Sequence, residues 1–150
     1  MNRWITYLTN LVAIVGVAIL IYEVSQNTQA LKNETDVAVY QMGIDNRQKL
    51  IENNQLRELY YRVETIRWSE LTKDEQYLLL AYWTAELDRT ELQYILHRRN
   101  GTKLDNIVFN ERDLLLEPFQ TGWSAWKVNY DADFVEFFDG IISRAKLNDE

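Results

Sequence analysis

The sequence contains no cysteine, a single proline, five glycines and one histidine among its 150 residues. Without cysteine, the chain has no disulfide bond, no thiol nucleophile and no thiolate metal ligand. Glycine is also too scarce to build a phosphate-binding loop, and the motifs G-x-S-x-G, G-x-x-x-x-G-K-[ST] and G-x-G-x-x-G do not occur. These absences exclude several classes of enzyme, and the shortage of helix breakers favours helix throughout.

Basic residues are outnumbered by acidic ones. Arg3 is the only charged side chain before residue 23, so the rest of the chain carries 15 basic and 23 acidic residues, a net charge of −8. Such a surface repels phosphate groups, and no stripe of lysine and arginine follows a helix face. We therefore expect no nucleic-acid partner.

His97, the one histidine, does not belong to a recognisable catalytic or metal-binding pattern. It precedes Arg98 and Arg99 at what we predict is a helix end, where positive charge complements the helix dipole. A di-iron site in a helical bundle needs Glu-x-x-His pairs, but neither Glu86 nor Glu91 has a histidine three residues later. We predict no catalytic residue, no cofactor and no metal site, and hence a protein that is not an enzyme.

The longest charge-free run extends from Trp4 to Tyr22. As a helix it would be about 28 Å long, close to the roughly 30 Å of a bilayer's hydrocarbon core. Trp4 and Tyr22 are placed at its two ends as membrane-interface anchors usually are. A cleaved signal peptide is the competing interpretation, but the run is long for one and no A-x-A cleavage site follows. Residues 1–22 are therefore predicted to form a transmembrane anchor, with membrane lipid as a partner.

Few charges are available to orient this anchor. Arg3 and the amino terminus lie on one side, and Lys32 is the only basic residue in the first twenty on the other. The positive-inside rule then favours a cytoplasmic amino terminus, with the main domain on the periplasmic side of a bacterial inner membrane.

One face of the predicted span is small and polar. Its members recur at steps of three and four residues, which places them on the same side of a helix. They either lie near the membrane interface or form a helix–helix contact in a homo-oligomer, for which small residues and a buried amide are typical. The residues are Thr6, Thr9, Asn10, Ala13 and Gly16.

The span is expected to continue as a stalk helix over residues 23–52, because no proline and only Gly43 occur between Tyr22 and Gln55. A seven-residue apolar step runs from Val24 through Leu31 but later reaches Asp45, so a regular coiled coil is not predicted. The amide-rich stretch either contacts neighbouring protomers or is a solvated spacer. The candidate contact residues are Gln26, Asn27, Gln29 and Leu31.

Residues 53–150 are predicted to form a soluble helical bundle. A turn at 52–55 precedes a short amphipathic helix, and Thr72 and Glu75 form a capping box that begins a long one. That helix is expected to end at Asn100-Gly101. Its predicted buried stripe consists of Tyr77, Leu80, Ala81, Thr84, Leu87 and Ile95.

Three further helices complete the prediction. One runs from about Lys103 to a point before Pro118, a short one follows Gly122, and the last begins after Asp131. The predicted fold class is all-α, with one transmembrane helix that continues into a stalk and is followed by a small bundle.

Aromatic residues are frequent in the predicted bundle, and most are expected in its core. Neighbours on a helix point about 100° apart, so the rings of pairs such as Tyr60-Tyr61 and Tyr82-Trp83 are not all expected to face inward. Some of these rings would then cover another surface, for which a partner subunit is the simplest candidate.

The stretches YEVSQNTQAL at 22–31 and GWSAWKVNYDADFVEFFDGII at 122–142 resemble a family of short single-span bacterial membrane proteins without an assigned activity. In that family Y-E-x-x-Q-N-T lies at the membrane exit, and it is matched here by Tyr22, Glu23, Gln26, Asn27 and Thr28. An E-N-x-x-L turn is matched by ENNQL, although proline is expected in place of Asn54. The resemblance implies a single-span protein and no particular substrate or cofactor.

The sequence thus favours a structural membrane protein whose protomers assemble into a homo-oligomeric ring or array. Two alternatives stay open. One is a pore or gate in which the face of Thr6, Asn10 and Ala13 lines water. The other is a monomeric anchored module whose acidic domain binds a peptide or a cationic ligand.

Overall fold

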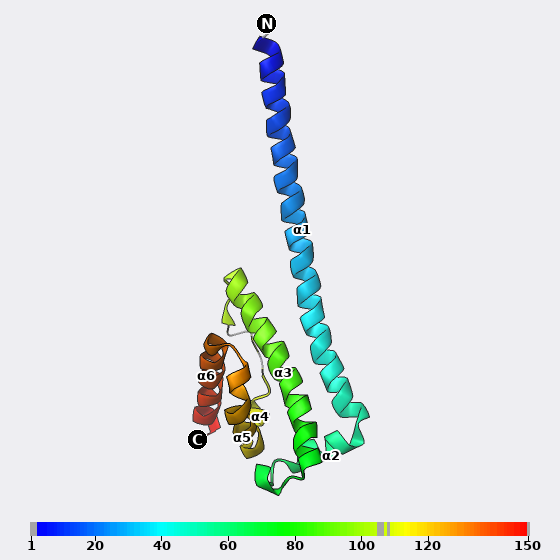
Figure 1. Ribbon diagram of the computed structural model, residues 1–150, viewed down its shortest axis with the longest axis vertical. Coiled ribbons are helices and arrows are strands. Elements are labelled where there is room, and N and C mark those ends of the chain that lie inside the picture. Colours follow the sequence, from blue (N-terminus) through cyan, green and yellow to red (C-terminus); the bar gives the residue numbers. More distant parts are fainter. Residues whose placement is uncertain (1–2, 105–106, 108, 150) are drawn as a thin grey trace. The chain divides into compact units, whose positions relative to one another are not determined.

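The computed structural model describes residues 3–104, 107 and 109–149, with the side chains of 3, 5–11 and 149 excepted. All regular structure in this part of the chain is helical, which confirms the all-α prediction. Figure 1 shows the helices in chain order. They are α1 (Arg3–Glu52), α2 (Asn54–Arg62), η1 (Trp68–Glu70), α3 (Lys73–Asn100), α4 (Glu111–Leu115), α5 (Glu117–Trp126), η3 (Lys127–Asn129) and α6 (Ala132–Asp149).

The chain divides into two compact units, Met1–Tyr40 and Gln41–Glu150. We call residues 3–40 of α1 the N-terminal segment and the second unit the bundle. Helix α1 is continuous through the predicted span and stalk and ends at Glu52. Some side-chain hydroxyls bond back to this helix: Thr28 donates to the Val24 carbonyl oxygen at 2.7 Å.

The structure gives no direct support for the predicted membrane span. Among the described residues, no helix carries a stretch both long and apolar enough to cross a bilayer. The side chains of residues 5–11, a large part of the predicted span, lie outside the described ones. The transmembrane anchor therefore stays a prediction.

The predicted turn at 52–55 is present and depends on Asn53. This residue leaves the helical region, with φ −92° and ψ 98°, and ends α1. Its side-chain oxygen then accepts the backbone N–H of Leu56 at 3.0 Å and caps α2. Helix α2 buries Leu59 and Tyr60 against the bundle core, as expected of a short amphipathic helix.

Both predicted ends of α3 are confirmed. The Glu75 backbone N–H donates to the Thr72 hydroxyl at 3.3 Å, and the Thr72 N–H donates to the Glu75 carboxylate at 2.8 Å. At the other end Gly101 has φ 62°, in the left-handed region that glycine adopts without strain.

The predicted buried stripe of α3 is wrong. Of its members only Leu87 is buried, whereas Tyr77 is 69% and Ile95 48% exposed. The observed buried stripe also has helical periodicity, so periodicity alone does not distinguish it from the predicted one. The stripe with the larger aromatic side chains faces the core. Its residues are Leu79, Tyr82, Trp83, Leu87, Thr90 and Tyr94.

The expectation that these neighbouring aromatic residues do not all face inward is confirmed at Tyr61, although both members of the other pair are buried. Tyr82 and Trp83 are both buried because α3 has packed neighbours on two sides. The Tyr82 ring contacts Tyr60 of α2, while the Trp83 ring meets Phe119 of α5 edge-on with centroids 5.4 Å apart. Tyr60 and Tyr61 do diverge, since Tyr60 is buried and Tyr61 is exposed.

The segment between α3 and α6 also differs from the prediction. In the part of this segment that the structure describes, the α-helix expected from Lys103 is limited to the five residues of α4, whose first turn is capped by the Asn110 side chain. A helix does end before Pro118, since α4 ends at Leu115, and Pro118 itself lies in the first turn of α5, where its missing N–H costs nothing. Gly122 lies inside α5 and does not precede the helix. A Cβ there would lie 2.3 Å from the Trp126 ring, so a larger residue would displace that ring.

Helix α6 begins after Asp131, as predicted. It buries Phe134, Phe138, Ile142 and Ala145, which recur at helical spacing. The Phe138 ring packs on Trp123 of α5, with centroids 4.9 Å apart. An aromatic core thus joins α3, α5 and α6.

Candidate functional sites

The N-terminal segment carries a continuous apolar surface. Between residues 12 and 24, nine large apolar side chains are each 50–66% exposed. Because they follow one another along the helix, they cover it on all sides rather than along one stripe. They are Val12, Ile14, Val15, Val17, Ile19, Leu20, Ile21, Tyr22 and Val24.

The predicted contact face in this segment is described only in part. Thr6, Thr9 and Asn10 lie outside the residues whose side chains are described. Ala13 is exposed, and a Cβ added at Gly16 would meet no atom within 4 Å. The face is therefore accessible at these two positions, and its role in an oligomer stays a prediction.

The amide-rich stretch is largely satisfied within its own helix. Gln26 Nε2 donates to the Tyr22 hydroxyl at 2.9 Å, and Gln29 Nε2 donates to Asn33 Oδ1 at 3.2 Å. Both bonds span four residues, which is the spacing at which helix side chains meet. The Y-E-x-x-Q part of the motif therefore has a local explanation, because it joins a tyrosine to the next turn of helix.

All of the predicted stalk contacts are at the surface. Gln26, Asn27, Gln29 and Leu31 are exposed, Leu31 by 64%. The predicted interface anchors are exposed as well, Trp4 by 83% and Tyr22 by 65%. These side chains are free to contact lipid or a second chain.

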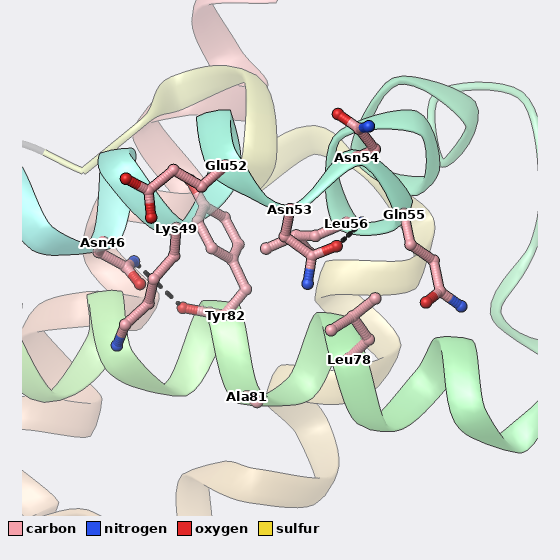
Figure 2. A pocket seen from close by; sticks show the side chains of 10 residues that line it. All are labelled: Asn46, Lys49, Glu52, Asn53, Asn54, Gln55, Leu56, Leu78, Ala81 and Tyr82. Atoms are coloured by element: carbon pink, nitrogen blue, oxygen red, sulfur yellow. Dashed lines mark hydrogen bonds between the residues drawn. The ribbon is translucent and has the colours of Figure 1, made fainter.

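The bundle contains an open groove of about 700 Å³ that the sequence did not reveal. Figure 2 shows α3 as its floor, with the end of α1 and the start of α2 above it. The floor is formed by Leu78, Ala81 and Tyr82, and the remaining lining is mostly polar. The polar lining consists of Asn46, Lys49, Glu52, Asn53, Asn54 and Gln55.

A second polar cluster lies inside the bundle around Asp113, which is only 2% exposed. The Tyr60 hydroxyl donates to Asp113 Oδ1 at 2.7 Å, and Asn110 Nδ2 donates to the Tyr60 oxygen at 2.7 Å. Burial raises the pKa of Asp113 from 3.8 to about 6, against the opposing effects of the Tyr60 hydrogen bond and the charge of Arg112. Burial raises the pKa of Tyr60 as well.

The indole of Trp83 lies beside this cluster. Its N–H is fully buried and has no hydrogen-bond partner of good geometry in the part of the chain that the structure describes. It is nevertheless close enough to Asp113 to lower the pKa of that carboxyl group. Arg112 covers the cluster from outside, with its guanidinium 4.9 Å from the Tyr60 ring centroid.

The sequence held only weak signals for these two bundle sites. The ENNQ stretch predicted a turn but not the groove, which depends on α3 packing below that turn. Asp113 precedes three leucines, and such an isolated acid at the start of an apolar run is the only hint of its burial.

No known family model matches this chain, and no curated protein or solved structure is significantly similar to it. The resemblance to single-span bacterial proteins therefore stays a prediction.

Proposed function

We propose that this is a non-enzymatic, single-span protein of the bacterial inner membrane whose copies assemble through the N-terminal segment into a homo-oligomeric ring or array. Residues 4–22 would be the anchor, and the bundle would be the domain outside the bilayer. The observation that carries the proposal is the run of nine exposed apolar side chains on an unbroken helix.

The free energy at stake in covering that surface is large. Full burial of one large apolar side chain is worth about 1.5–3 kcal/mol, so nine that are at least half exposed represent on the order of 10 kcal/mol. Soluble monomers rarely leave so extended an apolar surface in water. Lipid, other copies of the chain, or both would cover it.

Assembly of several copies is supported by the continuity of α1. A simple tether could end in a glycine- or proline-rich linker, which would uncouple the domain from its anchor. Here the helix runs on from residue 22 to Glu52. In an oligomer, Ala13 and Gly16 would allow close approach of helix backbones, as small residues do in membranes.

Cysteine crosslinking tests the assembly, since the chain has no cysteine of its own. Single cysteines placed in turn at positions 24 through 31 should give disulfide-linked dimers whose yield oscillates with a period near 3.6 residues. A cysteine in place of Val128, an 81% exposed bundle residue, measures random collision. Yields no higher than at position 128, or without periodicity, would contradict assembly through the stalk.

A pore is the second form that such an assembly could take. In it the face with Asn10 and Ala13 would line water instead of packing against a neighbour. Conductance across a planar bilayer separates the two forms, because a packed array gives none.

A further inference from the structure

We propose that the groove between α1, α2 and α3 of the bundle binds an extended, positively charged peptide segment of another protein. This proposal is independent of the assembly of the N-terminal segment, because every residue that lines the groove belongs to the bundle.

Two asparagines offer the groove one hydrogen-bond acceptor and one donor, the amide oxygen of Asn46 and the amide nitrogen of Asn53. Asn46 Nδ2 donates to Glu86 Oε1 at 2.7 Å, which leaves its Oδ1 as an acceptor. Asn53 Oδ1 accepts the Leu56 N–H at 3.0 Å, which leaves its Nδ2 as a donor. Figure 2 shows the Asn53 nitrogen directed toward α3. The bonds behind each amide fix its orientation, so the groove offers one acceptor and one donor in set positions.

These two amides are suited to a peptide backbone. Asn46 is 96% buried, so its amide is held in place by the surrounding helices and offers its oxygen in a fixed position. The two residues are seven positions apart, which corresponds to about 10 Å along a helix axis. About three residues of extended chain cover that distance, and a backbone offers an N–H and a C=O on the same edge. Gln55 adds a flexible amide beside them.

The floor and the volume fit a short segment. Leu56, Leu78 and Ala81 provide an apolar surface for a side chain of the peptide. The groove's volume of about 700 Å³ lies within the roughly 300–1,000 Å³ that is usual for ligand sites. Main-chain hydrogen bonds of this kind give affinity, and the apolar floor gives selectivity.

The charge of the bundle favours a cationic occupant. Residues 41–150 contain 14 basic and 20 acidic side chains, a net charge of −6. Within the groove, the charges of Lys49 and Glu52 cancel. The net negative charge of the whole bundle therefore favours a positively charged ligand. The peptide is therefore recognised by its backbone in the groove and attracted by the net negative charge of the bundle.

Fluorescence anisotropy of the full-length protein in detergent tests the proposal with labelled heptapeptides. The probes are acetyl-KVKAKVK-amide, its versions with serine or glutamate at the lysine positions, and a version of the lysine peptide with N-methylated backbone nitrogens. We expect the lysine peptide to bind at least tenfold more tightly than the glutamate one, and N-methylation to abolish binding. No binding below about 1 mM by any probe, or equal binding of the N-methylated peptide, would overturn the proposal.

Protein variants locate the peptide. Asn53→Asp keeps a side-chain oxygen to cap α2 but replaces the groove-facing donor by an acceptor. Asn129→Asp adds the same charge to the bundle on an exposed side chain that does not line the groove. We expect N53D to bind the lysine peptide at least tenfold more weakly than N129D does. Equal affinities would overturn the proposed contact.

A second variant blocks the groove without touching the core. Ala81 is an exposed residue of its floor, so Ala81→Trp fills the space and keeps the buried face of α3. Loss of peptide binding with an unchanged circular dichroism melt is the expected result. Unchanged binding by A81W would place the peptide elsewhere and contradict the proposal.

Discussion

The N-terminal segment and the bundle use the same kinds of apolar side chain in opposite ways. Val12, Ile14 and Ile21 are about two-thirds exposed, whereas Leu79, Phe119 and Phe138 of the bundle are wholly buried. The bundle supplies its own apolar environment through packing between helices. The N-terminal segment is a single helix, and its side chains require an environment from outside the chain.

Polar side chains show the same difference. In the N-terminal segment, amides bond four residues along the same helix, as Gln26 does with Tyr22. In the bundle, Asn46 bonds Glu86, and Asp113 bonds Tyr60 across 53 positions of sequence. Substitutions in the first region should therefore change where the protein resides, and substitutions in the second should change how firmly it folds.

The largest expected effect is the loss of membrane association on introduction of two charges. Val15→Lys with Val17→Lys places both lysines inside the predicted span, where each costs about 2.5–3.5 kcal/mol on insertion. We expect alkaline carbonate to extract this variant, while the unchanged protein stays in the membrane pellet.

Val24→Lys is the control for that experiment, because it adds a lysine just outside residues 4–22 on a side chain that is also more than half exposed. It should stay in the pellet. Extraction of the unchanged protein would contradict the membrane anchor, and equal extraction of both variants would contradict its boundaries.

The next largest effect is expected in the aromatic core. Phe138 is fully buried between Phe109, Phe119 and Trp123, so Phe138→Ala should lower the free energy of unfolding by about 3–5 kcal/mol. Urea denaturation followed by circular dichroism measures it. Tyr77→Ala removes a ring that is 69% exposed and should change stability by less than about 1 kcal/mol. Similar losses in both variants would contradict this assignment of the core.

A smaller effect is expected from the pH dependence of Asp113. Its pKa is raised in the folded protein from 3.8 to about 6, so folding is favoured while the carboxyl group stays protonated. The resulting stability is complete below about pH 4 and is lost as the pH rises through 6, by about 3 kcal/mol in total.

Asp113→Asn isolates this contribution, since asparagine can accept the same hydrogen bond from Tyr60 and does not titrate. The difference in unfolding free energy between D113N and the unchanged protein should widen from pH 4 to pH 7 in favour of D113N. Parallel pH profiles in urea denaturation would show that Asp113 does not titrate in this range.

The smallest effect is expected at the start of α3. Thr72→Ala removes the hydroxyl that accepts the Glu75 N–H and should cost about 1 kcal/mol. Ser143→Ala removes an exposed hydroxyl bonded to its own helix at Asp139 and should lie within about 0.5 kcal/mol of the unchanged protein. Thermal melting compares the two, and an equal shift in both would contradict the role of the cap.

Features set by neighbouring residues were predictable from the sequence. The capping box at Thr72, the left-handed Gly101 and the start of α6 after Asp131 each depend on a few adjacent side chains. The buried face of α3 was not, because two stripes share the helical period and packing on α2 and α5 decides between them. Pro118 is compatible with a helix start as well as with a preceding helix end.

The same distinction between local and tertiary features applies to the candidate sites. The exposed apolar run of the N-terminal segment follows directly from composition. The groove and the Asp113 cluster both require residues more than thirty positions apart, such as Asn46 with Glu86 and Tyr60 with Asp113. No local pattern brings such residues together, so only the tertiary structure reveals these sites.

The buried indole of Trp83 gives the protein an optical probe of its own interior. Ionisation of Asp113 places a negative charge beside this ring, and a charge close to an indole shifts its emission. The chain has five tryptophans, and phenylalanine at the other four would leave Trp83 as the only indole emitter. The wavelength of its fluorescence emission would then report the ionisation of Asp113 without any attached dye.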